Sequence, residues 1–361
     1  MYLNPKDWDE KLQRVKRSHN NSARANNLIA QKIATISEEI LRLEAEATPY
    51  APSRVFQTLE PSPFVGFLEF SKRVIERNRH SYAVGSLNRV RAVVSKVSTY
   101  LCGKEIPLDA VTVSWLKDYE SYLKGELGNK VNTVGANLKV IRKVLNDALD
   151  EGLIAQNPFD RFSIRSEPSD IEYLTEEELE AFINVPLPEG SRQAQHRDLY
   201  VFACFAGGIR ISDLLKMQWK NYDGERIRLI TSKTSEPLSI RLPSVAQEIV
   251  ERQGAHRELS EYIFGLLSGD LELGDKSAVH LAVVRQTALI NKNLKQIAKL
   301  AGIDKNIHFH TSRHTWATRA LRKGMRIEHV SKLLTHQSIK TTQIYAKIVN
   351  ADLDEAMNVF N

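Results

Sequence analysis

The chain has few cysteines and no long hydrophobic run. Only Cys102 and Cys204 occur in 361 residues, which excludes a disulfide framework and a zinc site built from thiolates. We predict an apolar helical setting for both. The chain lacks the roughly eighteen consecutive apolar residues of a membrane span, and its charged first residues lack the apolar core of a signal peptide. These absences predict a soluble, cytoplasmic protein with no membrane partner.

Length and charge narrow the class of protein further. A chain of 361 residues exceeds one ordinary hydrophobic core, so we expect two domains, or two with an appendage. Its 42% hydrophobic and 26% charged residues are typical of a globular protein. The net charge of +6 favours a polyanionic partner, although charge alone leaves nucleic-acid binding open.

The pattern of apolar residues predicts a mainly α-helical fold. After a proline-containing linker between Thr48 and Pro63, we expect helices over 64–79, 81–102, 112–125 and 132–151. Thr175 and Glu178 form a capping box that begins the next helix, and further helices are expected over 195–206, 281–301 and 312–323. Alternation over 226–230 and 238–242 predicts a small β-hairpin. These elements divide the chain into parts at 1–60, 61–162 and 170–361.

Two helices of the middle part carry basic residues opposite their apolar faces. These candidate DNA contacts are Arg89, Arg91, Lys96, Lys139, Arg142 and Lys143. A basic helix face can be merely solvated or can neutralise phosphates, and charge alone leaves both open. The same holds for the basic patch of the first part, where a turn leads into a short helix and a longer helix starts near residue 27.

The stretch from residue 308 to 345 concentrates reactive side chains. His310 and Arg313 are three residues apart, so on a helix they share a face that suits an oxyanion. His336 precedes Tyr345 by nine residues. Taken alone, Tyr345 can be a packed aromatic or a nucleophile.

Two further cations come from distant parts of the sequence. Arg210 follows a double glycine at a helix start, and Lys233 lies on the turn of the predicted hairpin. Phosphoryl transfer without a metal needs several positioned donors of this kind. We expect no metal, because His308, His310 and His314 have no carboxylate or thiolate to complete a tetrahedral set.

These segments resemble the signature boxes of the tyrosine recombinases, the phage integrase family. The matching segments are Gly207 to Leu214, Lys233 with Thr234, His310 to Thr315, Leu334 to His336, and Tyr345. The resemblance in the catalytic part spans about 172–349. Two departures stand out: Thr335 replaces the usual glycine and Gly207 a frequent threonine. The resemblance implies a catalytic domain of the recombinase fold, preceded by a SAM-like helical core-binding domain that closes over DNA as part of a clamp.

The resemblance also assigns roles to the cations. Arg210 and Arg313 would clamp the scissile phosphate, while His310 and His336 would donate hydrogen bonds to the transition state or assist proton movement. No metal or cofactor would be needed.

The remaining roles concern the bonds made and broken. Tyr345 would attack phosphorus and form a 3′-phosphotyrosyl link, and Lys233 would protonate the leaving 5′ oxygen. Asp213 would hold the catalytic side chains in position without itself contacting the phosphate. We expect His314 to be a packed helix residue behind Arg313.

As partners, the resemblance implies double-stranded DNA, a homotetramer on two duplexes formed from free monomers, and accessory bending or directionality factors. The first part resembles a truncated arm-type DNA-binding domain of mobile-element integrases of the Bacteroidetes type, so integration or excision is the expected role. A DNA inversion recombinase, a type IB topoisomerase and an accessory DNA-binding protein without chemistry are the alternatives. An apolar stripe in the tail packs on its own domain or on a neighbouring subunit; it comprises Leu353, Ala356, Met357 and Phe360.

Overall fold

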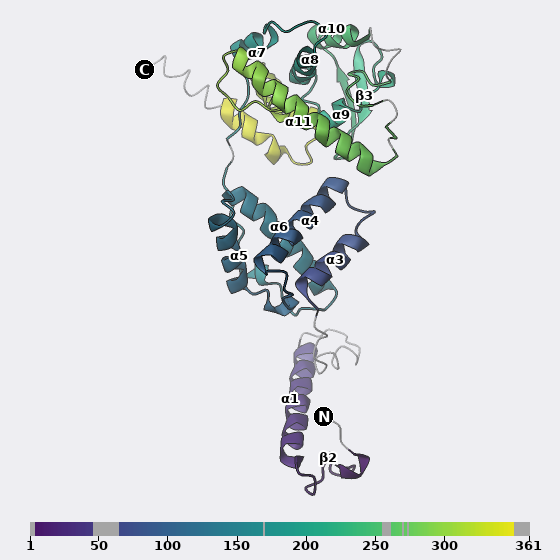
Figure 1. The fold of residues 1–361 in the computed structure, drawn as a ribbon, viewed down its shortest axis with the longest axis vertical. Helices are drawn as coiled ribbons and strands as arrows, with labels where there is room; N and C mark the ends of the chain where they lie inside the picture. The colour runs from purple at the N-terminus through teal and green to yellow at the C-terminus, as the bar shows by residue number, and fades with distance from the viewer. Residues whose placement is uncertain are drawn as a thin grey trace, which may run out of the picture. The chain divides into compact units, whose positions relative to one another are not determined.

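Helices dominate the computed structural model, which describes residues 4–45, 65–168, 170–254, 261–268, 271–272 and 274–349 (Figure 1). The chain divides into two compact units, Met1–Glu167 and Pro168–Asn361, each described by itself. In the described ranges each unit holds one small antiparallel sheet of two strands. The predicted fold class, mainly helical with a small hairpin in the catalytic part, is confirmed. The predicted linker and the tail stripe lie outside the described residues.

The start of the first unit is a short strand pair followed by a long helix. A 3-10 helix, Pro5–Asp7, leads into β1 (Trp8–Asp9), which pairs with β2 (Arg14–Val15), and α1 spans Ser22–Ala45. The side chain of Asn26 holds β2 to α1, because it accepts from the Val15 N–H at 2.8 Å and donates to the Val15 carbonyl at 3.0 Å. The strand pair was not predicted, since two-residue strands are too short to show an alternating pattern.

Four helices form the rest of the first unit, as predicted: α3 (Phe67–Arg77), α4 (Val84–Tyr100), α5 (Val113–Gly125) and α6 (Val131–Asp150). Their apolar faces share one core. Glu105 caps α3 from a distant loop, where its carboxylate accepts the backbone N–H groups of Leu68 and Glu69. The helical setting predicted for Cys102 is wrong. The chain turns after α4, and Cys102 is exposed with a φ of 52°.

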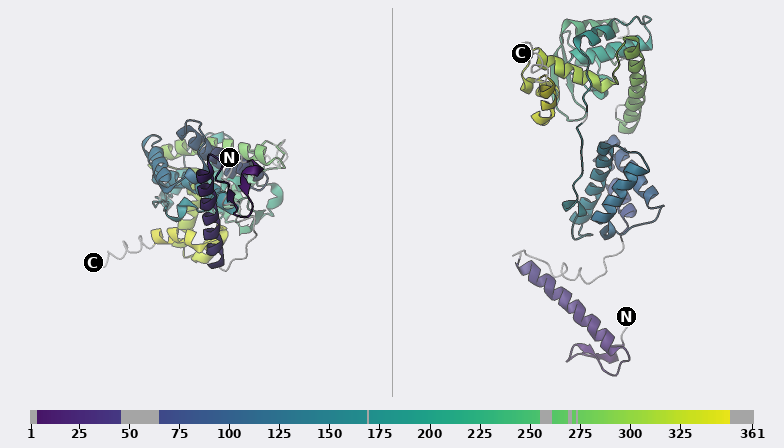
Figure 2. Two further views of the ribbon diagram at one scale, coloured as in Figure 1. Left: turned by 90° about the horizontal axis from the view of Figure 1, so that it is seen from below. Right: turned by 90° about the vertical axis from the view of Figure 1, so that its left-hand side faces the viewer.

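The second unit is built around α8 (Arg192–Phe205), which is labelled in Figure 1. The apolar residues of α8 are almost entirely buried. Helices α7 (Glu176–Ile183), α10 (Ser244–Gln253), α11 (Lys276–Leu300) and α12 (Phe309–Arg322) pack against it. The helix α13 (Ile327–Leu333) packs on α12. In the right-hand view of Figure 2, α11 and α13 lie at opposite sides of this unit. The predicted capping box of Thr175 and Glu178 begins α7.

Polar contacts hold α12 against its neighbours. The buried Arg319 donates to the carboxylate of Glu176 at 2.6 Å and 3.0 Å and to the carbonyl of Cys204 at 3.0 Å. The hydroxyl groups of Tyr200 and Thr311 are 2.8 Å apart. Since buried polar groups are costly when unpaired, these bonds restrict α12 to one position.

The predicted hairpin is confirmed. Strand β3 (Arg226–Ile230) pairs with β4 (Pro237–Arg241), with Arg226 opposite Arg241 and Ile230 opposite Pro237. The turn between the strands spans residues 231–236. The short helix α9 (Ile211–Leu214) lies between α8 and this hairpin in the sequence. Among the helices in the described ranges, none is long and apolar enough to cross a membrane.

Candidate active site

Arg313 joins three segments of the second unit. It lies on α12 and is only 4% exposed. One terminal nitrogen donates to the carbonyl of Gly208 at 2.8 Å, and the other donates to the carbonyl of Leu334, just beyond α13. The guanidinium therefore holds the loop after α8 and the end of α13 against α12.

The double glycine before Arg210 permits this close approach. Gly207 and Gly208 have φ values of +74° and +62°, which side chains rarely adopt. A Cβ atom at Gly208 would lie 3.1 Å from Cγ of Arg313 and 3.2 Å from a methyl group of Leu334. Glycine at 208 thus allows the loop to reach the buried arginine.

Arg210 comes directly after this loop, and its side chain is held by Thr335, just beyond the end of α13. It occupies the N-cap position of α9 and is half-buried. One of its terminal nitrogens donates to the hydroxyl of Thr335 at 3.0 Å. Thr335 itself has a φ of 52°, a conformation that favours glycine. The structure therefore brings the first predicted arginine to the end of α13, beside Arg313.

His336 follows Thr335 and is half-buried. Its Nδ1 atom lies 2.9 Å from the hydroxyl of the buried Thr342. Desolvation, together with the charges of Arg313 and Arg210, lowers the pKa of His336 to about 4. The imidazole is therefore neutral at pH 7.

His310 lies one turn from Arg313 on α12. Its ring is in edge contact with that of His314, at 4.7 Å between centroids. Desolvation by the surrounding protein and the charges of His314 and Arg313 lower the pKa of His310 to about 4, although the residue as a whole is exposed. Both predicted histidines are thus neutral neighbours of buried cations, as expected of a site where positive groups crowd together.

The same crowding affects the arginines. Burial, and then repulsion by Arg210, lowers the pKa of Arg313 to about 10. Burial lowers the pKa of Arg210 as well. Both groups keep their charge at pH 7, so an anion bound between them would relieve their mutual repulsion.

Asp213 connects α9 to the turn that carries Lys233. Its Oδ1 atom accepts the backbone N–H of Ser232 at 2.9 Å, and the residue is 4% exposed. Lys233 itself is exposed on this turn and has no hydrogen bond or ion pair within the described part of the chain. The geometry leaves Lys233 free to reach a ligand while its backbone is anchored.

Tyr345 is buried rather than displayed. It lies in a helical segment, residues 343–349, and is 2% exposed within a small cluster that includes Trp316, Val330 and Leu334. Burial raises the pKa of its phenol. The hydroxyl oxygen lies 2.8 Å from Nδ1 of His314.

The role expected for His314, packing behind Arg313, is therefore incomplete. The side chain is half-buried, yet its Nδ1 atom binds the hydroxyl of Tyr345. Its position four residues after His310 on a helix was the available signal, because that spacing places both rings on one face. Distance along the sequence hid the contact with Tyr345, 31 residues away.

The cations predicted to bind DNA lie on two helices of the first unit, Arg89, Arg91 and Lys96 on α4 and Lys139, Arg142 and Lys143 on α6. Those on α6 are exposed and share one face. Lys96 reaches Asn137 of α6 at 3.5 Å, so it lies on the α6 side of α4. Arg91 instead lines a hollow beside α3 with Lys72 and Glu105. The structure thus separates Arg91 from the α6 cations.

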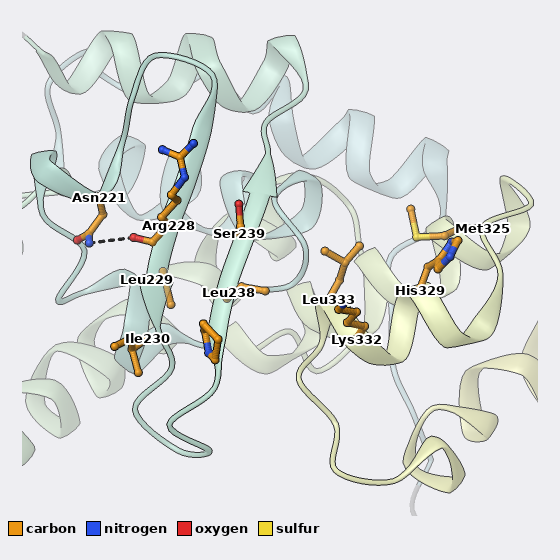
Figure 3. Close-up of a pocket in the computed structure, with 11 residues that line it drawn as sticks. Asn221, Arg228, Leu229, Ile230, Leu238, Ser239, Met325, His329, Lys332 and Leu333 are labelled. Carbon is orange, nitrogen blue, oxygen red and sulfur yellow. Dashed lines mark hydrogen bonds between the residues drawn. The ribbon is translucent and has the colours of Figure 1, made fainter.

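A groove of about 1050 Å³ lies between the hairpin and α13 (Figure 3). Its lining is largely apolar and includes Ile230, which is 73% exposed, and Leu333. His329 and Lys332 add basic groups, and Arg228 also lines the groove, although its guanidinium pairs with the Asp223 carboxylate. In the described ranges, no three His, Cys, Asp or Glu side chains are placed to hold a metal ion.

Three family models match successive parts of the chain. They are the phage integrase family over residues 172–351, the phage integrase SAM-like domain over 66–164 and the arm DNA-binding domain over 1–55. The chain belongs to the phage integrase family of tyrosine recombinases. The family expected from the signature segments is confirmed.

Relatives of this recombinase family extend the match over most of the chain. A tyrosine recombinase of Thermosipho africanus is 27% identical over 301 residues, which cover 80% of this chain and 96% of the relative. The Tn1549 transposon integrase in complex with transposon right end DNA is 17% identical with a TM-score of 0.61, over 81% of this chain and 99% of that one. A lambda integrase tetramer bound to a Holliday junction is 16% identical with a TM-score of 0.62, over 95% and 93%. This chain has the same fold as these two integrase structures.

The close approach of Gly208 to Arg313 is testable in this recombinase by Gly208→Ala. We expect a loss of about 2 kcal/mol or more in the free energy of unfolding, from a strained φ and from displacement of Arg313. Urea denaturation measures the loss. Gly302→Ala is the matched control, because its φ is +69° and its Cβ would meet nothing within 4 Å. Equal losses in both variants would contradict the steric argument.

Proposed function

We propose that the chain is a site-specific DNA recombinase that cuts and rejoins DNA through a 3′-phosphotyrosyl intermediate. The observation that carries the proposal is that Arg210 and Arg313 both bind the segment just after α13, at Thr335 and Leu334, beside neutral histidines and a tyrosine. Such a set stabilises the charge that develops on a phosphate and supplies a nucleophile. Membership of the phage integrase family supports it.

In this mechanism the two arginines bind the nonbridging oxygens of the scissile phosphate, because a guanidinium pairs with two oxygens and stays charged. His310 and His336 are neutral and donate hydrogen bonds to the same oxygens. Tyr345 attacks phosphorus, and Lys233 protonates the 5′ oxygen that leaves. Asp213 holds the turn of Lys233 through the backbone of the neighbouring residue.

We assign the reaction to integration and excision of a mobile element, acting in the cytoplasm on nucleoid DNA. The shared fold of the Tn1549 transposon integrase and the match to an arm DNA-binding domain support this assignment. A DNA inversion recombinase would use the same site. An accessory DNA-binding protein would need none of the catalytic side chains, and this chain has the whole set.

The domain division at 1–60, 61–162 and 170–361 gives each part a task in this proposal. The first part adds a DNA contact through its exposed cations, the middle part grips the duplex through α6, and the last part carries the chemistry. Exposed lysine and arginine side chains on α6 would bind phosphates without reading the base sequence.

Recombination between two duplexes requires several subunits, and we propose a homotetramer whose tails link neighbours. The groove between the hairpin and α13 is apolar with basic groups at His329 and Lys332, while the Arg228 guanidinium pairs with Asp223. Residues 350–361 combine the apolar stripe with three acidic residues, Asp352, Asp354 and Glu355. Their charge and apolar character complement the groove, so we assign the groove to the tail of a second copy. The lambda integrase tetramer bound to a Holliday junction supports this assembly.

The recombinase proposal is tested with nicked suicide duplexes that tile the DNA flanking the gene. We expect the native protein to become covalently attached to one of these duplexes, as shown by a denaturing gel. Tyr345→Phe should form no adduct while binding the same duplex, because only the nucleophilic oxygen is lost. Site-specific binding without any adduct from the native protein would reject the catalytic proposal and favour an accessory role.

The grip of α6 is tested by replacing Lys139, Arg142 and Lys143 together with glutamine. The slope of log affinity against log salt is negative, and each lost phosphate contact should make it less steep by about 0.9, so we expect its magnitude to fall by about 2.7. Titrations at several salt concentrations measure the slope. Arg91→Gln is the control and should change the slope by less than about 0.5. An unchanged slope in the triple variant would contradict the role of α6.

The groove is tested by Ile230→Asp and, separately, by removing residues 351–361. Each variant should bind a single site normally and lose multi-subunit complexes in a gel shift. An aspartate in the groove repels the acidic tail, and the truncated chain has no tail to place there. Leu300→Asp, which alters another exposed apolar residue, should keep both complexes. Native assembly by Ile230→Asp would show that the tail does not use this groove.

A further inference from the structure

Among the reactive side chains of the second unit, Tyr345 makes its hydroxyl contact with a residue outside the proposed catalytic set. Nδ1 of His314 lies 2.8 Å from the phenolic oxygen, a normal distance for a hydrogen bond. The two rings have centroids 5.6 Å apart and are tilted by 48°. Within the described residues, no other side chain has a hydrogen bond to this oxygen.

We propose that His314 is the general base that takes the proton from Tyr345 as the tyrosine attacks DNA. This inference rests on the proposed function and adds a seventh residue to its machinery. The Tyr345 O–H bond breaks and its proton passes to Nδ1 of His314 while the Oη–P bond forms. The bond from phosphorus to the 5′ oxygen then breaks, and the 5′ oxygen receives a proton from Lys233. In the reverse step His314 returns its proton to the departing tyrosine.

The other two histidines of the site are placed differently. Nδ1 of His336 is engaged by the hydroxyl of Thr342. His310 contacts the ring of His314 edge-on and has no hydrogen bond to Tyr345 among the described contacts. Position therefore selects His314, because a general base must lie within hydrogen-bond reach of the proton that it removes.

Burial makes a base necessary. Tyr345 is 2% exposed, and its pKa is raised by desolvation, so the free phenolate is scarce at neutral pH. A neighbouring group that accepts the proton during attack removes the need to form the phenolate first. His314 is half-buried, and its ring contacts both the ring of Tyr345 and that of His310. His314 therefore links the buried hydroxyl to the cation cluster.

The charges around His314 keep its acceptor nitrogen available. Desolvation first, and then His308, Arg313 and His336, lower its pKa to about 4, so the ring is neutral above about pH 5. An anionic DNA phosphate among these cations would offset their repulsion and raise the basicity of His314. Bound DNA would thereby turn a weak base into a stronger one at the moment of cleavage.

The test measures single-turnover adduct formation by the full chain on the nicked duplex that the native protein cleaves, between pH 6 and 9. His314→Asn keeps a hydrogen-bond acceptor near the position of Nδ1 but cannot take a proton. We expect His314→Asn and His314→Ala to react at least about 100-fold more slowly at pH 7. Their rates should rise about tenfold per pH unit, since hydroxide must then ionise the tyrosine, while the native rate levels off.

Two controls separate proton transfer from structural effects. Added imidazole should accelerate His314→Ala by filling the vacated space, and it should not accelerate His308→Ala, which removes a ring that does not bind Tyr345. Melting temperature and DNA affinity of each variant show whether folding or binding has changed. Single-site binding should persist in all of them.

Two outcomes would overturn the inference. A native rate in His314→Asn would show that only the hydrogen bond matters, and a faster rate would show that His314 restrains the tyrosine. Both outcomes leave the proposed recombinase standing. If the native protein forms no adduct on any duplex, the proposed function itself fails, so the two failures are distinguishable.

Discussion

The second unit depends on the hydrogen bonds of one buried arginine. Arg313 donates to the backbone carbonyls of Gly208 and Leu334, and these carbonyls belong to segments that are distant in the sequence. A buried guanidinium without partners would be strongly destabilising, so the fold must supply both carbonyls wherever Arg313 is buried. Positions of Arg210 and His336 follow from this constraint, because each lies within two residues of one of those carbonyls.

A consequence of this arrangement is a dense cluster of positive and neutral nitrogen groups. Desolvation and repulsion by neighbouring positive groups lower the pKa values of His310 and His336 to about 4 and that of Arg313 to about 10. The carboxylate of Asp213, which binds the backbone of the hairpin turn, offsets part of this repulsion, yet the pKa values of Arg210 and Arg313 remain lowered. Such a site favours an anion, because the anion relieves repulsion that the folded protein already bears.

Local patterns predicted most of the helices and the hairpin. The apolar faces of α3 to α6, the capping box of α7 and the alternation in β3 and β4 all depend on residues close in sequence, which explains the success. The strand pair β1 and β2 was missed because it is too short to leave a pattern. Cys102 was misplaced because the end of α4 is decided by a turn with positive φ rather than by apolar spacing.

The sequence by itself determined the family, since the signature segments carry enough residue types in a fixed order to identify it, and it named the candidate catalytic side chains. Tertiary structure alone decided how they are connected. It showed Thr335 bonded to Arg210, Asp213 holding the turn of Lys233, and Tyr345 buried against His314. These contacts join residues from 19 to 125 positions apart. Periodicity reports only which face of an element a residue occupies, whereas contacts between elements are set by how the helices pack.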